Sequence, residues 1–203
     1  MPGLEKMNIS DHGTDNEIDC NVKDSSINLV VRGSRNRIIV APDVRLGQGD
    51  WQVNGDENRI VIGSEVRIGS LRIICQDCSL ISIGDRTTIE QAYILARDGC
   101  AVQIGMDCMI SFQVDIRTSD AHGIFDRSTG EWLNPPGDVT LEDHVWLSQG
   151  VIVSKNTRIQ HGAMIGSRSY VQNCIIPADA MAVGAPCRVV REEIRWTRSI
   201  DGK

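Results

Sequence analysis

The sequence lacks the features that mark a membrane protein or a nucleic-acid-binding protein. No apolar run approaches the roughly 18 residues that a spanning helix needs, and residues 1–20 are polar and acidic, unlike a secretory signal. Acidic residues are in excess, with 27 Asp and Glu against 21 Lys and Arg and a net charge of -6. Nucleic acids and anionic membranes attract clustered positive charge, so neither is an expected partner. We expect a single-domain, cytoplasmic protein.

Leucine is scarce as well. The chain has 9 Leu against 25 Ile and 18 Val, together with 19 Gly. Branching at Cβ favours extended backbone, whereas helices favour Leu. The composition therefore predicts a mostly β protein.

The seven cysteines form no paired metal-binding pattern. Cys75 and Cys78 make a single Cys-x-x-Cys, but a structural zinc site needs a second pair of ligands at similar spacing, and the sequence has none. A cytoplasmic chain keeps its thiols reduced. We therefore expect free thiols, with Cys75 and Cys78 as small core or corner residues, and no metal.

An aliphatic residue recurs at every sixth position in the C-terminal half. The series is Leu141, Leu147, Val153, Ile159, Ile165 and Val171. In the N-terminal half the six-residue series restarts in steps, as Ile62, Ile68, Ile74, Leu80, then Ile83, Ile89, Leu95, Ala101, then Ile104, Ile110, Ile116. A six-residue strand that sends its first and fifth residues inward must then bend, and three bends close a coil of about 18 residues. The pattern predicts a solenoid of parallel strands.

The repeat divides the domain into five segments. They are a polar N-terminal segment with the first strands (1–37), N-terminal coils (38–116), a loop (117–140), C-terminal coils (141–176) and a tail (177–203). A loop of this length in a compact repeat is uncommon unless it is functional. The tail is predicted to form a short helix or a capping segment, because four arginines recur in it at three- and four-residue spacings: Arg188, Arg191, Arg195 and Arg198.

Several segments resemble one known family. The six-residue repeat, with LEDHVWLSQG, IGSRSYV and the ending IPADAMAVGAPCRVVR, is similar to the hexapeptide-repeat acyltransferases over roughly residues 38–191. TSDAHGIFDRSTGEWLN resembles the loop of members that O-acetylate bacterial surface sugars. The resemblance implies a left-handed parallel β-helix, a homotrimer with active sites between subunits, acetyl-CoA as donor and a sugar or polysaccharide acceptor.

His122 is the candidate general base. A sugar hydroxyl needs a base to take its proton near neutral pH, and histidine suits that role. His12 lies in the polar N-terminal segment and His161 at an outward position, so both are expected on the surface. His122 stands in the long loop, where a solvated histidine is the simple alternative, but its Ser-Asp-x-His context resembles the family's catalytic loop. Asp120 and Asp126 are the candidates to orient its ring, and a backbone carbonyl would serve as well.

Trp146 is the candidate donor to the oxyanion of the thioester carbonyl. The segment Trp146-Leu147-Ser148 could supply an N–H from its backbone or from the indole, although packing under the loop would also explain this tryptophan. Asp126, Asn134 and His144 are the candidate substrate contacts. No Ser or Cys nucleophile is evident beside a histidine, so we expect direct transfer in a ternary complex.

The donor carries phosphates, and family members bind it along the last coils and tail. The candidate contacts are Ser148, Lys155, Gly166, Ser167, Arg168 and Arg188. Arginine pairs well with phosphate, although a solvated surface also explains such residues. Ser148 and Ser167-Arg168 depart from the small residues that the family usually has there.

Three other functions remain open from the sequence. An N-acetyltransferase would use an amino sugar, which depends less on the histidine. A non-catalytic solenoid scaffold would not need His122, because fold does not fix function. A zinc hydratase of the γ-carbonic-anhydrase type would need closely spaced histidine ligands, which this chain lacks.

Overall fold

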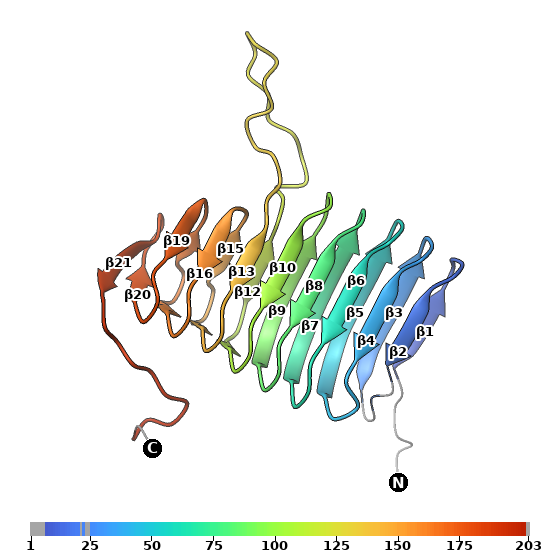
Figure 1. Cartoon of the computed structure of the whole chain (residues 1–203), viewed down its shortest axis with the longest axis horizontal. Helices are drawn as coiled ribbons and strands as arrows, with labels where there is room; N and C mark the ends of the chain where they lie inside the picture. Colours follow the sequence, from blue (N-terminus) through green and yellow to red (C-terminus); the bar gives the residue numbers. More distant parts are fainter. Residues whose placement is uncertain (1–6, 21, 23–24, 202–203) are drawn as a thin grey trace.

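The computed structural model describes residues 7–20, 22 and 25–201. All regular elements in these residues are β-strands, wound into the coils of a parallel β-helix (Figure 1). No helix of the described residues is long and apolar enough to cross a membrane. The prediction of an all-β solenoid from Ile and Val content and the six-residue repeat is confirmed.

Two sheets run along the whole solenoid. The eight-stranded sheet contains β2 (Glu17–Cys20), β4 (Arg37–Val40), β6 (Arg59–Ile62), β8 (Leu80–Ile83), β10 (Ala101–Ile104), β13 (Val139–Leu141), β16 (Thr157–Ile159) and β19 (Cys174–Ile176). The thirteen-stranded sheet contains β1 (Asn8–Asp11), β3 (Ser26–Arg32), β5 (Arg45–Asn54), β7 (Arg67–Gln76), β9 (Thr88–Ala96), β11 (Met109–Ile110), β12 (Val114–Arg117), β14 (Trp146–Leu147), β15 (Ile152–Ser154), β17 (Met164–Ile165), β18 (Tyr170–Val171), β20 (Met181–Val183) and β21 (Arg188–Arg191).

The core is a single aliphatic column inside the coils. All six members of the C-terminal series are buried, with exposed fractions of 0% or 1%. The residues four positions further on, such as Val145 and Ser169, are buried too, except after Val171, where Ile175 is 65% exposed. Val139 pairs with Thr157, one coil of 18 residues later (157 − 139), as the repeat predicts. The first and fifth residues of each six therefore fill the interior as far as Ser169.

The N-terminal coils are larger and shift the inward positions. Arg37 pairs with Arg59, 22 residues later (59 − 37), and strands such as β7 continue around a corner for ten residues. Leu71 and Ile73 fill the core here, whereas Ile74 and Leu80 are only half-buried. The six-residue count is wrong for Ile74 and Leu80, because within a continuous strand side chains alternate with a period of two.

The tail differs from the prediction, whereas the polar N-terminal segment contains strands. In this segment β1 pairs with β3 and β2 with β4. The predicted helix in the tail is wrong: Arg188–Arg191 form β21, antiparallel to β20. This pairing gives hydrogen-bond partners to the edge of the last coil, which a helix would leave open. Residues 192–201 then run back along the solenoid (Figure 1).

The long loop projects away from the coils. It leaves after β12 and returns at β13, and Figure 1 shows it extending well beyond the body of the solenoid. The loop therefore has almost none of the rest of the chain to pack against.

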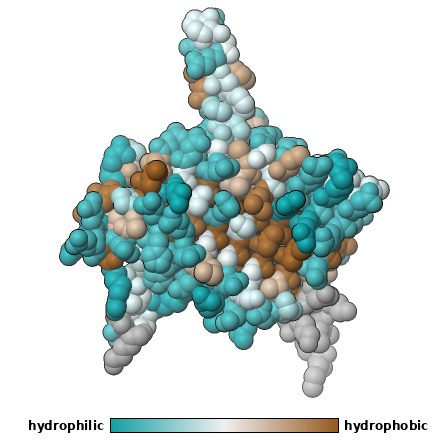
Figure 2. Space-filling view, in the orientation of Figure 1, coloured by the Kyte–Doolittle hydropathy of each residue, from teal (hydrophilic) through white to brown (hydrophobic). Residues whose placement is uncertain are grey.

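The visible face of the solenoid is apolar in the middle. Figure 2 shows apolar atoms gathered over the middle strands of this face, with polar atoms over both ends.

Candidate active site

A buried lysine fixes the base of the long loop, the neck, where Asp120 and Asn134 lie side by side. The Lys155 side chain, 3% exposed, donates from Nζ to Asp120 Oδ2 at 2.5 Å and to the Asn134 carbonyl oxygen at 3.0 Å. The hydrogen bond from Lys155 is the main reason why the pKa of Asp120 lies below its usual value. Lys155 thus connects both segments of the neck, at Asp120 and at Asn134, to the body of the solenoid.

Asn134 shapes the loop around His122. Its Nδ2 donates to Asp120 Oδ2 and to the carbonyl oxygen of His122, both at 2.9 Å. Its Oδ1 accepts from the Ile124 backbone N–H at 2.6 Å and from the Trp132 indole at 3.0 Å. The predicted substrate contact Asn134 therefore uses its whole amide group inside the loop.

The ring of His122 is exposed, and no described residue hydrogen-bonds to it. The carboxylate of Asp120 accepts from Lys155 and Asn134, and that of Asp126 accepts from Ser128 and Thr129. The hydrogen bond from Ser128 is the largest cause of the lowered pKa of Asp126. Both carboxylates are thus engaged within the loop and its neck, and only the backbone of His122 is fixed.

Trp146 lies at the start of β14 with its side chain half-buried. The backbone N–H groups of Trp146 and Ser148 donate to the carbonyl oxygens of Ala163 and Ile165 in the next coil, both at 3.0 Å. The indole N–H of Trp146 has no hydrogen-bond partner among the described residues. The indole N–H of Trp146 is therefore available, whereas the backbone N–H groups of Trp146 and Ser148 are not.

His144 is held by a cluster that sequence reasoning missed. Its ring stacks on the indole of Trp196 in the tail, with centroids 3.9 Å apart and planes at 6°. Nδ1 lies 2.7 Å from Asp107 Oδ2, and Nε2 lies 3.3 Å from the Trp196 carbonyl oxygen. Both nitrogens face acceptors, so the predicted substrate contact His144 has neither nitrogen available to a substrate. The rings of Trp146 and Trp196 lie 5.8 Å apart.

Arg198 completes this cluster. Its guanidinium donates to Asp107 Oδ1 at 3.0 Å, to the hydroxyl of Thr88 at 2.8 Å and to the carbonyl oxygen of Cys108 at 2.9 Å. Partial burial acts to raise the pKa of Asp107, but hydrogen bonds from His144 and Arg198 outweigh it and lower the pKa. Asp107 lies beside His144 in the neighbouring coil, because Met109 pairs with Trp146 and each residue of interest stands two positions earlier. Aligning the repeat across the loop would therefore have placed these two side chains together.

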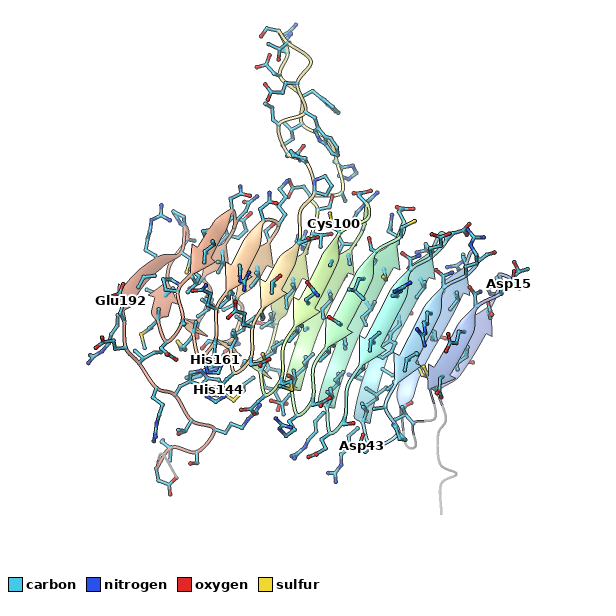
Figure 3. The ribbon with its side chains drawn as sticks, in the orientation of Figure 1. Asp15, Asp43, Cys100, His144, His161 and Glu192 are labelled. Carbon is cyan, nitrogen blue, oxygen red and sulfur yellow. The ribbon has the colours of Figure 1, made fainter. Side chains whose placement is uncertain are left out.

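His122 and Trp146 lie at different corners of the coil. The loop leaves the corner between β12 and β13, whereas Trp146 follows the next corner, between β13 and β14. Figure 3 labels His144, two residues before Trp146, near the bottom of the solenoid, while the loop rises from the top. The candidate base and the candidate N–H donor do not meet within one chain.

Most of the candidate donor contacts gather on the C-terminal side of Trp146. Ser148, Gly166, Ser167 and Arg168 follow β14 and β17, which are neighbours in the sheet. A Cβ on Gly166 would lie 2.6 Å from Val183 Cγ1. Val183 is in β20 and pairs with Arg188 of β21. Lys155 lies apart from this group, at the neck of the loop.

Side chains of the types that bind metal ions are dispersed over the described residues. Among the described residues, no group of three or more His, Cys, Asp or Glu side chains could hold a metal ion. Cys75 is buried, and this burial raises the pKa of its thiol to about 12. Cys78 is exposed, so the two thiols of the Cys-x-x-Cys sit in different environments.

Similar sequences include polysialic acid O-acetyltransferases. A polysialic acid O-acetyltransferase of Escherichia coli O1:K1 is 31% identical over 127 residues, which are 63% of this chain and 41% of that protein. One of Neisseria meningitidis is 27% identical over 134 residues, 64% of this chain and 62% of that protein. This chain thus spans less than two thirds of these relatives. No family model matches the sequence.

Solved structures show the same fold. The polysialic-acid-specific acetyltransferase NeuO superposes with a TM-score of 0.89 at 29% identity, covering 96% of this chain and 90% of that one. The polysialic acid O-acetyltransferase OatWY gives 0.86 at 22% identity, over 97% and 93% of the chains, and likewise has the fold. The predicted resemblance to left-handed β-helix, hexapeptide-repeat acetyltransferases is confirmed.

Proposed function

We propose that this chain is an acetyl-CoA-dependent O-acetyltransferase that acts on a hydroxyl of an acidic surface polysaccharide. Its similarity to polysialic acid O-acetyltransferases supports the reaction class and the type of acceptor. The observation that carries the proposed chemistry is that the ring of His122 and the indole N–H of Trp146 both lack partners among the described residues. We expect the reaction in the cytoplasm, where acetyl-CoA is made.

His122 takes the proton of the acceptor hydroxyl as the hydroxyl oxygen attacks the thioester carbonyl carbon. The indole N–H of Trp146 donates to the carbonyl oxygen as negative charge develops on it. The C–S bond then breaks, and the protonated ring of His122 returns the proton to the leaving thiolate. No described Ser or Cys side chain hydrogen-bonds to a histidine ring, which favours direct transfer over an acyl-enzyme.

Lys155, Asp120 and Asn134 act on the reaction through the loop. They hold the neck and the carbonyl oxygen of His122, so that the ring starts from a fixed backbone. In this arrangement Asp120 positions His122 without touching its ring. The sequence-based assignment of Lys155 to the donor is therefore replaced in the proposal by a positioning role.

The donor fits the corner on the C-terminal side of Trp146. Gly166 leaves that corner without a side chain, and Arg168 and Arg188 are exposed beside it. No described acidic residue forms an ion pair with either arginine. Acetyl-CoA, as co-substrate, supplies the acetyl group, and these arginines would pair with its phosphates.

The catalytic site is completed by a second copy of the chain. Since His122 and Trp146 lie at different corners of one solenoid, a neighbouring copy must bring its loop to Trp146. A ring of three copies provides three such sites by one repeated contact. This supports a homotrimer with active sites between subunits.

Subunit complementation tests this arrangement. His122→Ala and Trp146→Phe are each expected to lower the release of CoA thiol from acetyl-CoA with polysialic acid by about 10²-fold or more. Co-assembly of the two variants restores part of the activity, because some interfaces combine an intact His122 with an intact Trp146. Inactive mixtures of folded hetero-oligomers would contradict a shared site.

Measuring CoA release with polysialic acid and with amino sugars as acceptors distinguishes O-acetylation from N-acetylation and from a non-catalytic scaffold. Release with polysialic acid that disappears in His122→Ala supports O-acetylation. Release only with amino sugars, and with little effect of His122→Ala, would support the N-acetyltransferase. Neither release nor calorimetric binding of CoA would support a non-catalytic scaffold.

A further inference from the structure

A groove extends from Trp146 towards the N-terminal coils. Its volume is about 750 Å³, and it is lined by the beginnings of β5, β7, β9, β11 and β14. One row of lining residues is in register across these strands, each member pairing with the next: Arg45, Arg67, Thr88, Met109 and Trp146. The groove thus leads away from the proposed reaction centre, on the side opposite the candidate donor contacts.

Two glycines form the bare wall beside the arginines. A Cβ on Gly47 would lie 2.2 Å from the carbonyl oxygen of Gly69, and a Cβ on Gly69 would lie 2.7 Å from that of Glu90. No side chain fits at these positions unless the backbone moves. The hollow beside Arg45 and Arg67 is therefore built into the packing of successive coils.

The lining carries positive charge with unused hydrogen-bond donors. Arg45 and Arg67 are exposed, and their guanidinium groups have no hydrogen bond or ion pair with any described residue. Arg198 adds a third guanidinium beside Trp146, held by Asp107, and Glu90 is the acidic side chain of the lining. Arg45 and Arg67 are paired residues on adjacent strands, whose backbones lie about 4.8 Å apart, so both side chains can reach one extended chain.

We propose that this groove binds an extended acidic glycan chain. Arg45 and Arg67 pair with carboxylates of sugar units on one side of the reacting unit, while the reacting hydroxyl lies at Trp146. Planar guanidinium groups match carboxylates with two parallel hydrogen bonds. The inference rests on the proposed function, since it names the acceptor path of that site.

The test uses Arg45→Gln/Arg67→Gln and the matched control Arg59→Gln. Arg59 is an exposed arginine between those two in sequence, but it lies on β6 in the other sheet. We expect the double variant to raise KM for polysialic acid about tenfold or more, with kcat and KM for acetyl-CoA close to the parent. The control stays near the parent. Added salt weakens the parent more than the double variant.

Calorimetry without acetyl-CoA separates the groove from the chemistry. Loss of polysialic acid binding in the double variant, with weak binding of the neutral maltoheptaose by every protein, supports the groove even if no acceptor is acetylated. Parent-like binding of polysialic acid by the double variant overturns it, while transfer activity would leave the proposed function intact. Equal weakening by Arg59→Gln indicates general charge attraction and also overturns it.

Discussion

His122 and His144 lie on the same solenoid in opposite kinds of surroundings. The ring of His144 is stacked on Trp196, and both of its nitrogens face acceptor oxygens. The ring of His122 is exposed, and only its backbone carbonyl is held, through Asn134. A general base must keep a nitrogen available for the substrate proton.

Hydrogen bonding to the ring distinguishes a candidate general base from a structural histidine better than burial alone does. Each histidine has a carboxylate nearby, His122 in the sequence and His144 in space. Asp107 is bonded directly to the ring of His144, whereas Asp120 supports the loop that carries His122. His144 therefore contacts the tail with its ring, whereas the ring of His122 stays free for the proposed role of general base.

Removing each imidazole should break this comparison most clearly. His122→Ala is expected to lower kcat by about 10²- to 10⁴-fold, the usual contribution of a positioned base, while the circular dichroism spectrum stays that of the parent. His144→Ala should lower kcat far less. Steady-state CoA release measures both, and an equal or larger loss in His144→Ala would reverse the assignment.

The two tryptophans sharpen the same contrast. Trp146→Phe keeps an aromatic ring but removes the indole N–H, so kcat should fall by about 10²-fold, as for loss of one oxyanion donor. Trp196→Phe removes an N–H that donates to the His144 carbonyl oxygen at 3.1 Å, so this N–H is already used within the protein. Its kcat should change little. A parent-like Trp146→Phe would show that the indole N–H does not serve the reaction.

Lys155→Met should lower kcat by about tenfold, because loop geometry affects the reacting positions, with KM for acetyl-CoA unchanged. The double variant Lys155→Met/Asp120→Asn should lose less than the sum of the single variants, since Lys155 and Asp120 form one ion pair. A donor contact would behave differently. It would raise KM for acetyl-CoA and act independently of Asp120.

Trp196→Ala should release the tail with a smaller effect on catalysis. Residues 192–201 are then expected to become sensitive to protease, because the ring that stacks on His144 is gone. kcat should stay within a factor of about three, as expected for a residue outside the reacting groups. Limited proteolysis with mass spectrometry gives the readout, and a tail that stays protected would show that the Arg198 contacts and β21 hold it without the stacked ring.

Acid should open the neck of the loop. The hydrogen bond from Lys155 lowers the pKa of Asp120 below its ordinary value of about 3.9. A lowered pKa in the folded state contributes stability above the unfolded value, and that stability is lost as the pH falls through the folded value. The amide signal of Asn134 should therefore shift only below about pH 4. Asp120→Asn should lack this transition; the same transition in that variant would assign it to another group.

The sequence predicted the coils well because their determinants are local and repeated. The six-residue series from Leu141 to Val171 fills the core as expected, since each strand and bend is written in its own residues. The prediction failed at Ile74, where a ten-residue strand replaced two short ones, and in the tail, where pairing with β20 replaced a helix. In both places contacts with neighbouring strands overrode the local pattern.

By itself, the sequence determined the β-helix, the position of the projecting loop and the residue types that the proposed reaction needs. Only the tertiary structure decided their partners. Lys155 meets Asp120 across 35 positions, His144 meets Asp107 across 37, and Arg198 meets Asp107 across 91. Such contacts depend on how many residues each coil takes and on the path of the tail. The folded chain therefore leaves the ring of His122 available and places an acceptor oxygen beside each ring nitrogen of His144.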